Sequence, residues 1–287
     1  MRLNRKWNDF RLYAITGENY HPGRSMLEVM EQALIGGADI VQLRAKDLSK
    51  QEVLAQGFAL RELTRHYGVP LIINDHLDVA LYVDADGVHL GQDDLQLAEA
   101  RRILGPERII GISTHNIGQA LEAERGGADY IGVGPVFPTG TKPGRMAVTT
   151  DYVREAARQV SIPFVAIGGI TLENVDQVLD AGAARICAVS AIVGSSDVAG
   201  SCRAFLKKIK LREAGDKLGD SPFTVLLNGK SEKTTARTVG ELVIQLGLVG
   251  KRIVVEMNGA IISREIWNTT LLEDGASLEL VHFVGGG

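Results

Sequence analysis

The chain has 287 residues, which suits either two domains of ordinary size or one barrel of about 250 residues with a remainder. With 45% hydrophobic and 23% charged residues and a formal net charge of -4, it is typical of a folded protein without a global basic field. It lacks an apolar run of ~18 residues and a signal-peptide core, and two cysteines cannot form a disulfide framework. We therefore expect a soluble, cytoplasmic protein with no nucleic-acid and no membrane partner.

Eight short apolar runs recur in the first two thirds of the chain, separated by segments with helical spacing. The runs are 11–16, 39–44, 70–75, 87–91, 108–113, 129–134, 163–169 and 185–191. Such runs are typical of parallel strands covered on both faces. Capping boxes that begin at Ser25 and Ser49 predict helix starts, and glycines such as Gly37 predict helix ends. The repeated unit predicts an α/β fold, a (β/α)8 TIM barrel.

The pattern changes near residue 207. Residues 211–222 are rich in charged side chains and indicate a linker, so the expected domains are 1–210 and 223–287. The runs 223–229 and 252–259 each end in an Asn-Gly turn, Thr238 with Glu241 forms a capping box, and 277–284 is a final strand. This order predicts a small α+β domain with a β-grasp fold, followed by the tail Gly285, Gly286 and Gly287.

Cations and carboxylates follow several of the predicted barrel strands, where the active site of a TIM barrel lies. Arg44, Lys46 and Lys142 suit a multiply charged anion. Asp75 and Asp94 follow neighbouring strands, and two carboxylates beside an anion site are typical ligands of Mg²⁺. Two alternatives stay open: the aspartates cap the following helices, or Arg44 and Lys46 form ion pairs with acidic neighbours at the rim.

A second anion site is expected after the last two strands. Gly168 and Gly169 follow the seventh strand and Val189 and Ser190 the eighth, which are the common phosphate positions of these barrels. Thr139 and Thr141, in the loop after the sixth strand, add hydroxyl groups, and His89 and His115 near the rim either contact substrate or support the scaffold. Cys187 and Cys202 are expected to be packing residues. A barrel with two such sites would join two phosphorylated small molecules.

Two stretches of motifs resemble known families. Residues ~10–208 resemble thiamine phosphate synthase through QLRAKD (42–47), IINDH (72–76), GVHLGQDDL (87–95), GISTHN (111–116), GVGPVFPTGTKPG (132–144), AIGGIT (166–171) and AVSAI (188–192). Residues ~223–287 resemble the ubiquitin-like sulfur carrier of thiazole biosynthesis through LNGK (227–230), TVGELVIQLGL (238–248), VVEMNGAIISREIW (254–267) and LELVHFVGGG (278–287). The chain thus resembles a fusion of two thiamine-pathway proteins.

The first resemblance implies a transferase that condenses 4-amino-5-hydroxymethyl-2-methylpyrimidine diphosphate with thiazole phosphate, releasing pyrophosphate by dissociative substitution. It implies pyrimidine diphosphate contacts from Gln42, Leu43, Arg44, Ala45, Lys46, Asn74, Ser113 and Lys142, of which Arg44, Ser113 and Lys142 are catalytic. It implies thiazole phosphate contacts from Thr139, Gly140, Thr141, Gly169, Val189 and Ser190, and a Mg²⁺ cofactor on Asp75 and Asp94.

The second resemblance implies a non-catalytic carrier. Gly287, after Gly286, would be adenylated by a carrier-activating adenylyltransferase and converted to a thiocarboxylate, from which thiazole synthase draws sulfur. Two other interpretations stay open: a thiazole tautomerase barrel, which leaves Asp75 and Asp94 unexplained, and a catalytically silent barrel that carries an active sulfur carrier. Homo-oligomerisation is possible in any of these cases.

Overall fold

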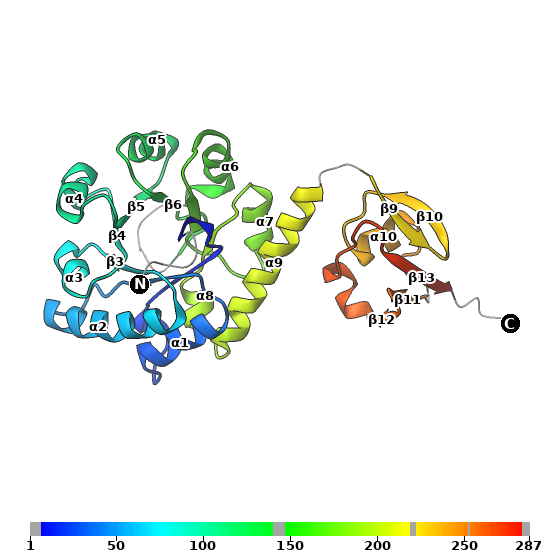
Figure 1. Ribbon diagram of the computed structural model, residues 1–287, viewed down its shortest axis with the longest axis horizontal. Coiled ribbons are helices and arrows are strands. Elements are labelled where there is room, and N and C mark those ends of the chain that lie inside the picture. The colour runs from blue at the N-terminus through cyan, green and yellow to red at the C-terminus, as the bar shows by residue number, and fades with distance from the viewer. Residues whose placement is uncertain (1–6, 140–146, 219–221, 252, 283–287) are drawn as a thin grey trace. The chain divides into compact units, whose positions relative to one another are not determined.

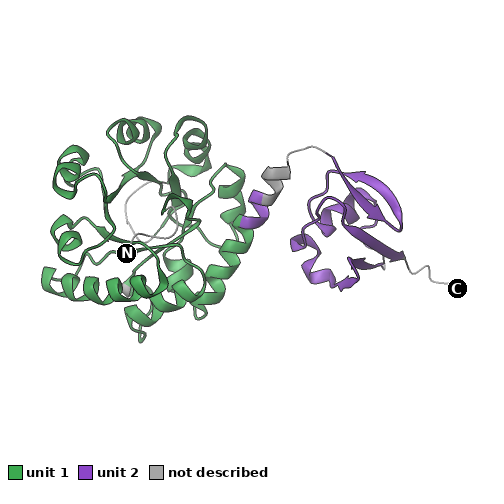
Figure 2. Cartoon of the chain, viewed as in Figure 1, with its two compact units in different colours: residues 1–209 green, residues 210–287 purple. Residues whose placement is uncertain are grey.

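The computed structural model describes residues 7–139, 147–218, 222–251 and 253–282 (Figure 1). The chain divides into two compact units, residues 1–209 and 210–287, which Figure 2 shows in different colours. Among the described residues, no helix combines the length and the apolar character that crossing a membrane requires.

The first unit is a closed barrel of eight parallel strands, and each strand pairs with the next one along the chain. The strands are β1 (Leu12–Ile15), β2 (Ile40–Leu43), β3 (Leu71–Asn74), β4 (Gly87–Leu90), β5 (Ile109–Thr114), β6 (Tyr130–Val133), β7 (Phe164–Ile167) and β8 (Ile186–Cys187). All eight lie within the predicted runs except that β5 extends one residue further, and the predicted TIM barrel is confirmed.

Helices alternate with these strands and form the outer layer of the barrel (Figure 1). They are α1 (Met26–Ile35), α2 (Lys50–Tyr67), α3 (Leu77–Tyr82), α4 (Leu97–Leu104), α5 (Ile117–Arg125), α6 (Thr149–Gln159), α7 (Val175–Asp180), α8 (Ser190–Val193) and α9 (Val198–Leu218), with short 3-10 turns at η1 (Trp7–Asp9) and η2 (Glu18–Tyr20). The helix α9 continues through most of the expected linker 211–222. The strand β8 is shorter than the predicted run 185–191 because Ser190 already begins α8.

The predicted capping boxes begin α1 and α2. Ser25 Oγ accepts a hydrogen bond from Glu28 N, while a Glu28 carboxylate oxygen accepts one from Ser25 N at 3.0 Å. Ser49 and Glu52 repeat this exchange at the start of α2. Both helices therefore begin at the residue that the sequence indicates, and this sets where the preceding strand-end loops must stop.

Two apolar layers stabilise the barrel. The outer layer lies between strands and helices and includes Leu12, Leu43 and Cys202. The inner layer fills the barrel and includes Tyr13, Tyr130 and Cys187. Successive residues of a strand face opposite sides of the sheet, so Leu12 points outward and Tyr13 inward. The inner layer forms the floor beneath the site.

The second unit is a five-stranded sheet with the order β10-β9-β13-β11-β12. Its elements are β9 (Phe223–Leu227), β10 (Lys230–Thr234), α10 (Val239–Gln245), β11 (Ile253–Met257), β12 (Ala260–Ile262), η3 (Arg264–Thr269) and β13 (Ser277–His282). Asn228 and Asn258 adopt positive φ of 49° and 51° in the two Asn-Gly turns, which close the hairpins β9–β10 and β11–β12. The strand β13 pairs in parallel with β9, and the predicted β-grasp order is confirmed.

Candidate active site

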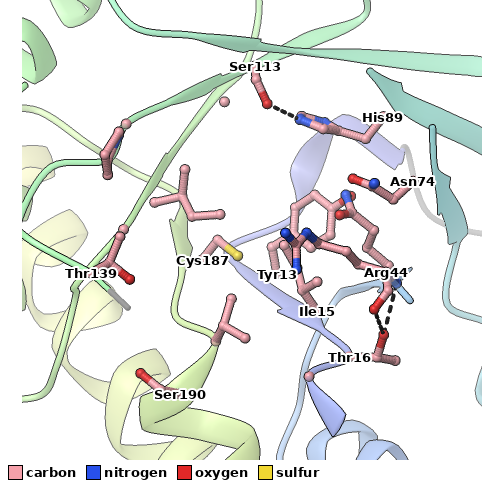
Figure 3. A pocket seen from close by; sticks show the side chains of 18 of the residues that line it. Tyr13, Ile15, Thr16, Arg44, Asn74, His89, Ser113, Thr139, Cys187 and Ser190 are labelled. Atoms are coloured by element: carbon pink, nitrogen blue, oxygen red, sulfur yellow. Dashed lines mark hydrogen bonds between the residues drawn. The ribbon is translucent and has the colours of Figure 1, made fainter. Parts of the chain in front are cut away.

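The C-terminal ends of the barrel strands surround a cavity of about 600 Å³. The predicted site residues that line it are Gln42, Arg44, Ala45, Lys46, Asn74, Ser113, Thr139, Gly169, Val189 and Ser190. In Figure 3, Thr139 and Ser190 lie on one side of the cavity, and Arg44 and Asn74 lie on the other. The structure therefore brings these residues of the two predicted anion sites together around one space.

Of the other predicted residues that the structure describes, Leu43, Asp75 and Asp94 are not among those that line the cavity. Leu43 packs in the outer core, 1% exposed, so its side chain points away from the cavity. Gly140, Thr141 and Lys142 lie outside the described residues, as do Gly286 and Gly287 at the tail.

Arg44 is held at the end of β2 by its neighbour strand. The Thr16 hydroxyl group donates to the Arg44 carbonyl oxygen at 3.0 Å and accepts from the Arg44 amide at 2.8 Å (Figure 3). Thr16 is 2% exposed, so this pair of bonds is shielded from water. The guanidinium group therefore extends into the cavity from a fixed backbone.

Lys46 extends the positive charge along the same side. Its Nζ lies 3.8 Å from Asp75 Oδ2, which is the rim ion pair that the sequence left open. The Lys46 side chain is half exposed, and an ion pair at this separation and exposure contributes little to stability. The lysine can thus turn to an anion in the cavity at small cost.

Asp75 and Asp94 lie side by side at the ends of β3 and β4. Asp75 has a left-handed φ of 62°, and its amide donates to the His89 carbonyl oxygen at 3.0 Å. Asp94 Oδ2 accepts from Gly91 N at 2.6 Å. Burial, a hydrogen bond with Asp94 and the charge of Asp94 together raise the pKa of Asp75.

The alternative that these aspartates cap helices does not fit the described residues. The N-cap positions of α3 and α4 are His76 and Gln96, and neither cap makes a side-chain bond. Two adjacent carboxyl groups, of which Asp75 has its pKa raised by burial and by Asp94, fit a divalent cation between them. Within the described residues, no group of three or more His, Cys, Asp or Glu side chains gathers as a metal site, so a cation here would take its remaining ligands from substrate and water.

Glycine backbone forms the opposite side of the cavity. Gly168 and Gly169 adopt φ of 103° and 63° after β7. Asn174 holds this loop, because its Nδ2 donates to the Gly169 carbonyl oxygen at 2.9 Å and its Oδ1 accepts from Thr171 N at 2.8 Å. The loop presents bare backbone to the cavity beside Thr139, which suits a phosphate group.

Histidine and cysteine residues support the site in different ways. His89 lines the cavity, and its Nε2 lies 2.8 Å from Ser113 Oγ (Figure 3). His115 Nδ1 donates to the Gly134 carbonyl oxygen at 2.6 Å, which fixes the start of the loop after β6. Cys187 lies in the cavity floor, 1% exposed, and burial raises the pKa of its thiol, so it stays protonated.

Several further residues that were not predicted from the sequence line the cavity, among them Tyr13, Ile15, Thr16, Asn19, Tyr20 and Asp47. Tyr13 and Thr16 belong to β1 and its end, where no charged motif drew attention. The available signal was the two-residue period of the strand, which turns Tyr13 and Ile15 to the same inward face.

This geometry defines a class: a TIM-barrel enzyme whose cavity has cations on one side, with a pair of carboxylates beside them, and glycine backbone suited to a phosphate on the other. Residues 12–192 match the family model described as thiamine monophosphate synthase, and residues 225–287 match the ThiS family. The chain belongs to the thiamine monophosphate synthase family. Both resemblances drawn from the motifs are thereby confirmed, and so is the prediction of an enzyme of this class with a separate carrier-type domain.

Individual relatives agree with this assignment. The thiamine-phosphate synthase of Halalkalibacterium halodurans is 61% identical over 208 residues, which make up 72% of this chain and 99% of that protein. The thiamine-phosphate synthase of Shouchella clausii is 58% identical over 198 residues, 69% of this chain and 95% of that protein. The solved structure of thiamine phosphate pyrophosphorylase from Pyrococcus furiosus matches with a TM-score of 0.66 and 38% identity, covering 72% of this chain and 99% of its own.

Proposed function

We propose that the barrel joins 4-amino-5-hydroxymethyl-2-methylpyrimidine diphosphate to thiazole phosphate and releases thiamine phosphate and pyrophosphate. The observation that carries this proposal is one cavity of about 600 Å³, lined by Arg44 and Lys46 on one side and by the glycine backbone of 168–169 on the other, with the Asp75 carboxylate 3.8 Å from Lys46 Nζ. A cavity of this volume suits two small ligands in contact, each with its phosphate group at one of the two sides. Membership of the synthase family supports the same assignment.

The pyrimidine diphosphate binds on the side of β2 and β3. Arg44 can bind the diphosphate through two parallel N–H donors, and the Lys46 ammonium group adds a point charge on the same side of the cavity. Asn74 and Ala45 line the path between the ring and the diphosphate, and Gln42 lies under the ring. Lys142 enters this proposal through the family resemblance, as a further cation on the leaving group.

Asp75 and Asp94 would hold Mg²⁺ on the diphosphate. When bound, the ion neutralises part of the negative charge of the departing pyrophosphate. The raised pKa of Asp75 supports this placement, because a nearby cation favours the charged form that Asp94 and burial disfavour. The two side chains then share one role, which is to orient the leaving group toward Arg44.

The thiazole phosphate binds on the opposite side. Gly169 offers backbone at φ of 63°, and Thr139, Ser190 and Val189 surround the same corner of the cavity. Gly140 and Thr141 join this site through the resemblance. Fixing the phosphate in this corner would direct the thiazole ring toward the pyrimidine methylene carbon.

The reaction is a dissociative substitution. The bond between the methylene carbon and the bridging oxygen breaks, and pyrophosphate leaves with the electron pair. The amino group of the pyrimidine ring stabilises the methylene cation, and the thiazole nitrogen then supplies the pair for the new C–N bond. The chain contributes positioning and charge rather than a nucleophile, which agrees with the protonated, buried thiol of Cys187.

A matched pair of variants tests the carboxylate assignment. Asp94→Asn removes the charge that faces Asp75, whereas Asp93→Asn removes the same charge from an exposed neighbour. We expect Asp94→Asn to lower the rate of thiamine phosphate synthesis by more than about tenfold at limiting Mg²⁺. A tenfold loss corresponds to about 1.4 kcal/mol of lost transition-state stabilisation. Asp93→Asn should stay near the wild-type rate. Equal rates for both variants would reject the role of Asp94, and turnover of a thiazole phosphate without pyrimidine diphosphate would favour the tautomerase alternative.

We also propose that residues 223–287 form a sulfur carrier, set apart from the barrel domain 1–210 by the segment 211–222. The ThiS-family match runs to Gly287, so the tail is part of the matched domain. Its partners would be an adenylyltransferase, which activates the Gly287 carboxylate, and thiazole synthase, which takes sulfur from the thiocarboxylate. The carrier would present its terminus without catalysing either step.

Intact-protein mass spectrometry tests the carrier proposal. With an activating enzyme, ATP and a sulfur donor, the full chain should gain the mass difference of one oxygen replaced by sulfur. Deletion of Gly286 and Gly287 should prevent this gain and leave barrel activity unchanged. A full chain that never forms the adenylate or the thiocarboxylate would refute the carrier role.

A further inference from the structure

A line of five hydrogen-bonded side chains crosses the floor of the cavity and joins five strands of the barrel. Gln42 Nε2 lies 2.8 Å from Tyr13 Oη, and Tyr13 Oη lies 2.9 Å from Tyr130 Oη. Tyr130 Oη lies 2.9 Å from His89 Nδ1, and His89 Nε2 lies 2.8 Å from Ser113 Oγ. Both ends, Gln42 and Ser113, line the cavity (Figure 3 shows the Ser113 end).

The barrel is built to accommodate the two tyrosines. Tyr13 and Tyr130 are 1% and 0% exposed. A Cβ at Gly111 on β5 would collide with the Tyr130 ring, so glycine at that position provides the space for the ring. Burial raises the pKa of both phenols well above the ordinary value, so both hydroxyl groups keep their protons.

These contacts have a direction. The Gln42 Nε2 atom can only donate, so Tyr13 Oη accepts from it. Among the described residues, the remaining partner of Tyr13 Oη is Tyr130, and a buried hydroxyl proton without an acceptor would carry its full desolvation cost. Tyr13 therefore donates to Tyr130, and Tyr130 donates to His89 Nδ1. The His89 proton then resides on Nε2 and is donated to Ser113 Oγ.

We propose that Tyr13 and Tyr130 are positioning residues that set the hydrogen-bond polarity at both ends of this line. At one end, Gln42 keeps its Oε1 as an acceptor for the cavity, since that atom accepts no hydrogen bond from the described residues. At the other end, Ser113 Oγ already accepts from His89, so its own proton is available to the cavity as a donor. The two ends are coupled, because each hydroxyl group or ring in the line donates one hydrogen bond and accepts another, so reversing the donor and acceptor of one bond reverses those of all the others.

This polarity matches the ligand of the proposed function, on which this part of the inference rests. An acceptor at Gln42 suits a ring that carries an amino group, and a donor at Ser113 suits an anionic oxygen of a leaving group. In the reversed line, Gln42 would present its amide N–H groups to the amino group of the ring. Ser113 would present its lone pairs to the anionic oxygen, so neither contact would be a hydrogen bond. The line thus selects an amino-substituted ring with an anionic leaving group through residues of the cavity floor.

Histidine-selective nitrogen-15 NMR of the full chain, without substrates, tests the direction. The His89 resonances are assigned as those lost in His89→Gln. We expect a neutral ring with the proton on Nε2 and an unprotonated Nδ1, and Tyr130→Phe should abolish this single-tautomer signature. A wild-type ring with its proton on Nδ1, or a signature unchanged in Tyr130→Phe, would overturn the proposal. This readout needs no turnover, so it stands even if the assigned reaction fails.

Steady-state kinetics of three Tyr→Phe variants provide the second test. Tyr13→Phe and Tyr130→Phe interrupt the line, whereas Tyr152→Phe removes another buried tyrosine hydroxyl that bonds to Thr114 Oγ1 at 2.6 Å outside the line. The two interrupting variants should lose about tenfold in kcat/KM for the pyrimidine diphosphate, the value of one hydrogen bond, with the KM for thiazole phosphate unchanged. An equal loss in Tyr152→Phe, or a loss shared by both substrates, would show a structural effect and contradict the proposal. Thermal unfolding of each variant is the control that it is folded at the assay temperature.

Discussion

The glycine loop after β7 offers a prediction whose magnitude follows from the structure. A Cβ at Gly169 would lie 2.5 Å from the Pro138 carbonyl oxygen and 2.8 Å from Phe137 Cβ. The left-handed φ of 63° adds about 1 to 2 kcal/mol of strain for any residue with a Cβ. Relief of the collision requires the loop that carries Thr139 to move, and overpacking of this kind costs about 1 to 3 kcal/mol.

Gly68 provides a matched control for Gly169→Ala. It ends α2 at φ of 66°, and a Cβ there would meet nothing within 4 Å. Gly68→Ala thus carries the strain without the collision. We expect Gly68→Ala to lower the Tm of the barrel by roughly 2 to 8 °C, at about 2 to 4 °C for each kcal/mol in a unit of this size.

The assay varies each substrate in turn at saturating levels of the other. Gly169→Ala should unfold at a lower temperature than Gly68→Ala and raise the KM for thiazole phosphate by about tenfold, which corresponds to about 1.4 kcal/mol of lost binding. Gly68→Ala should leave both KM values unchanged. If Gly169→Ala matches Gly68→Ala in Tm and leaves the KM for thiazole phosphate unchanged, then the loop does not define that phosphate site and the reasoning fails.

Two further predictions concern the carboxylate and asparagine residues of the rim. Burial and Asp94 raise the pKa of Asp75. A carboxyl group with a higher pKa in the folded state lowers the free energy of unfolding as pH rises from its unfolded to its folded pKa. The penalty is therefore present above the folded pKa of Asp75, so Asp75→Asn should stabilise the protein there in the presence of a chelator. Thermal unfolding should show this gain disappear below pH ~4, and a gain that persists in acid would contradict it. Asn174→Ala removes the two hydrogen bonds that hold the Gly169 loop. Initial-rate measurements should show a several-fold higher KM for thiazole phosphate and an unchanged KM for pyrimidine diphosphate. A change in the KM for pyrimidine diphosphate alone would contradict this assignment.

The barrel could be predicted from the sequence because its signals are local and repeated. Each strand is a short apolar run, and Ser25 with Glu28 marks a helix start by bonds within four residues. The short β8 was harder to predict. Residues 188–191 are as apolar as a strand, but the structure ends β8 at Cys187 and begins α8 at Ser190, which the local composition does not indicate.

The charged part of the site was predictable for a different reason. Arg44, Asp75 and Ser190 follow strands, and all strand ends of a parallel barrel meet on one side, so their gathering needs only the topology. Tyr13 and Tyr130 could not be found in this way, because a tyrosine inside a strand is typical of an apolar core. Their hydroxyl contacts join β1 to β6, which are far apart along the chain, and nothing in the local sequence indicates that pairing.

The most direct test of the whole account is a coupling assay on the full chain with both purified substrates. Thiamine phosphate and pyrophosphate should form in equal amounts when Mg²⁺ is present, and neither should form when one substrate or the metal is withheld. Thiamine phosphate that forms without release of pyrophosphate, or equal rates with and without Mg²⁺, would contradict the assignment of the cavity and of the two carboxylates, Asp75 and Asp94.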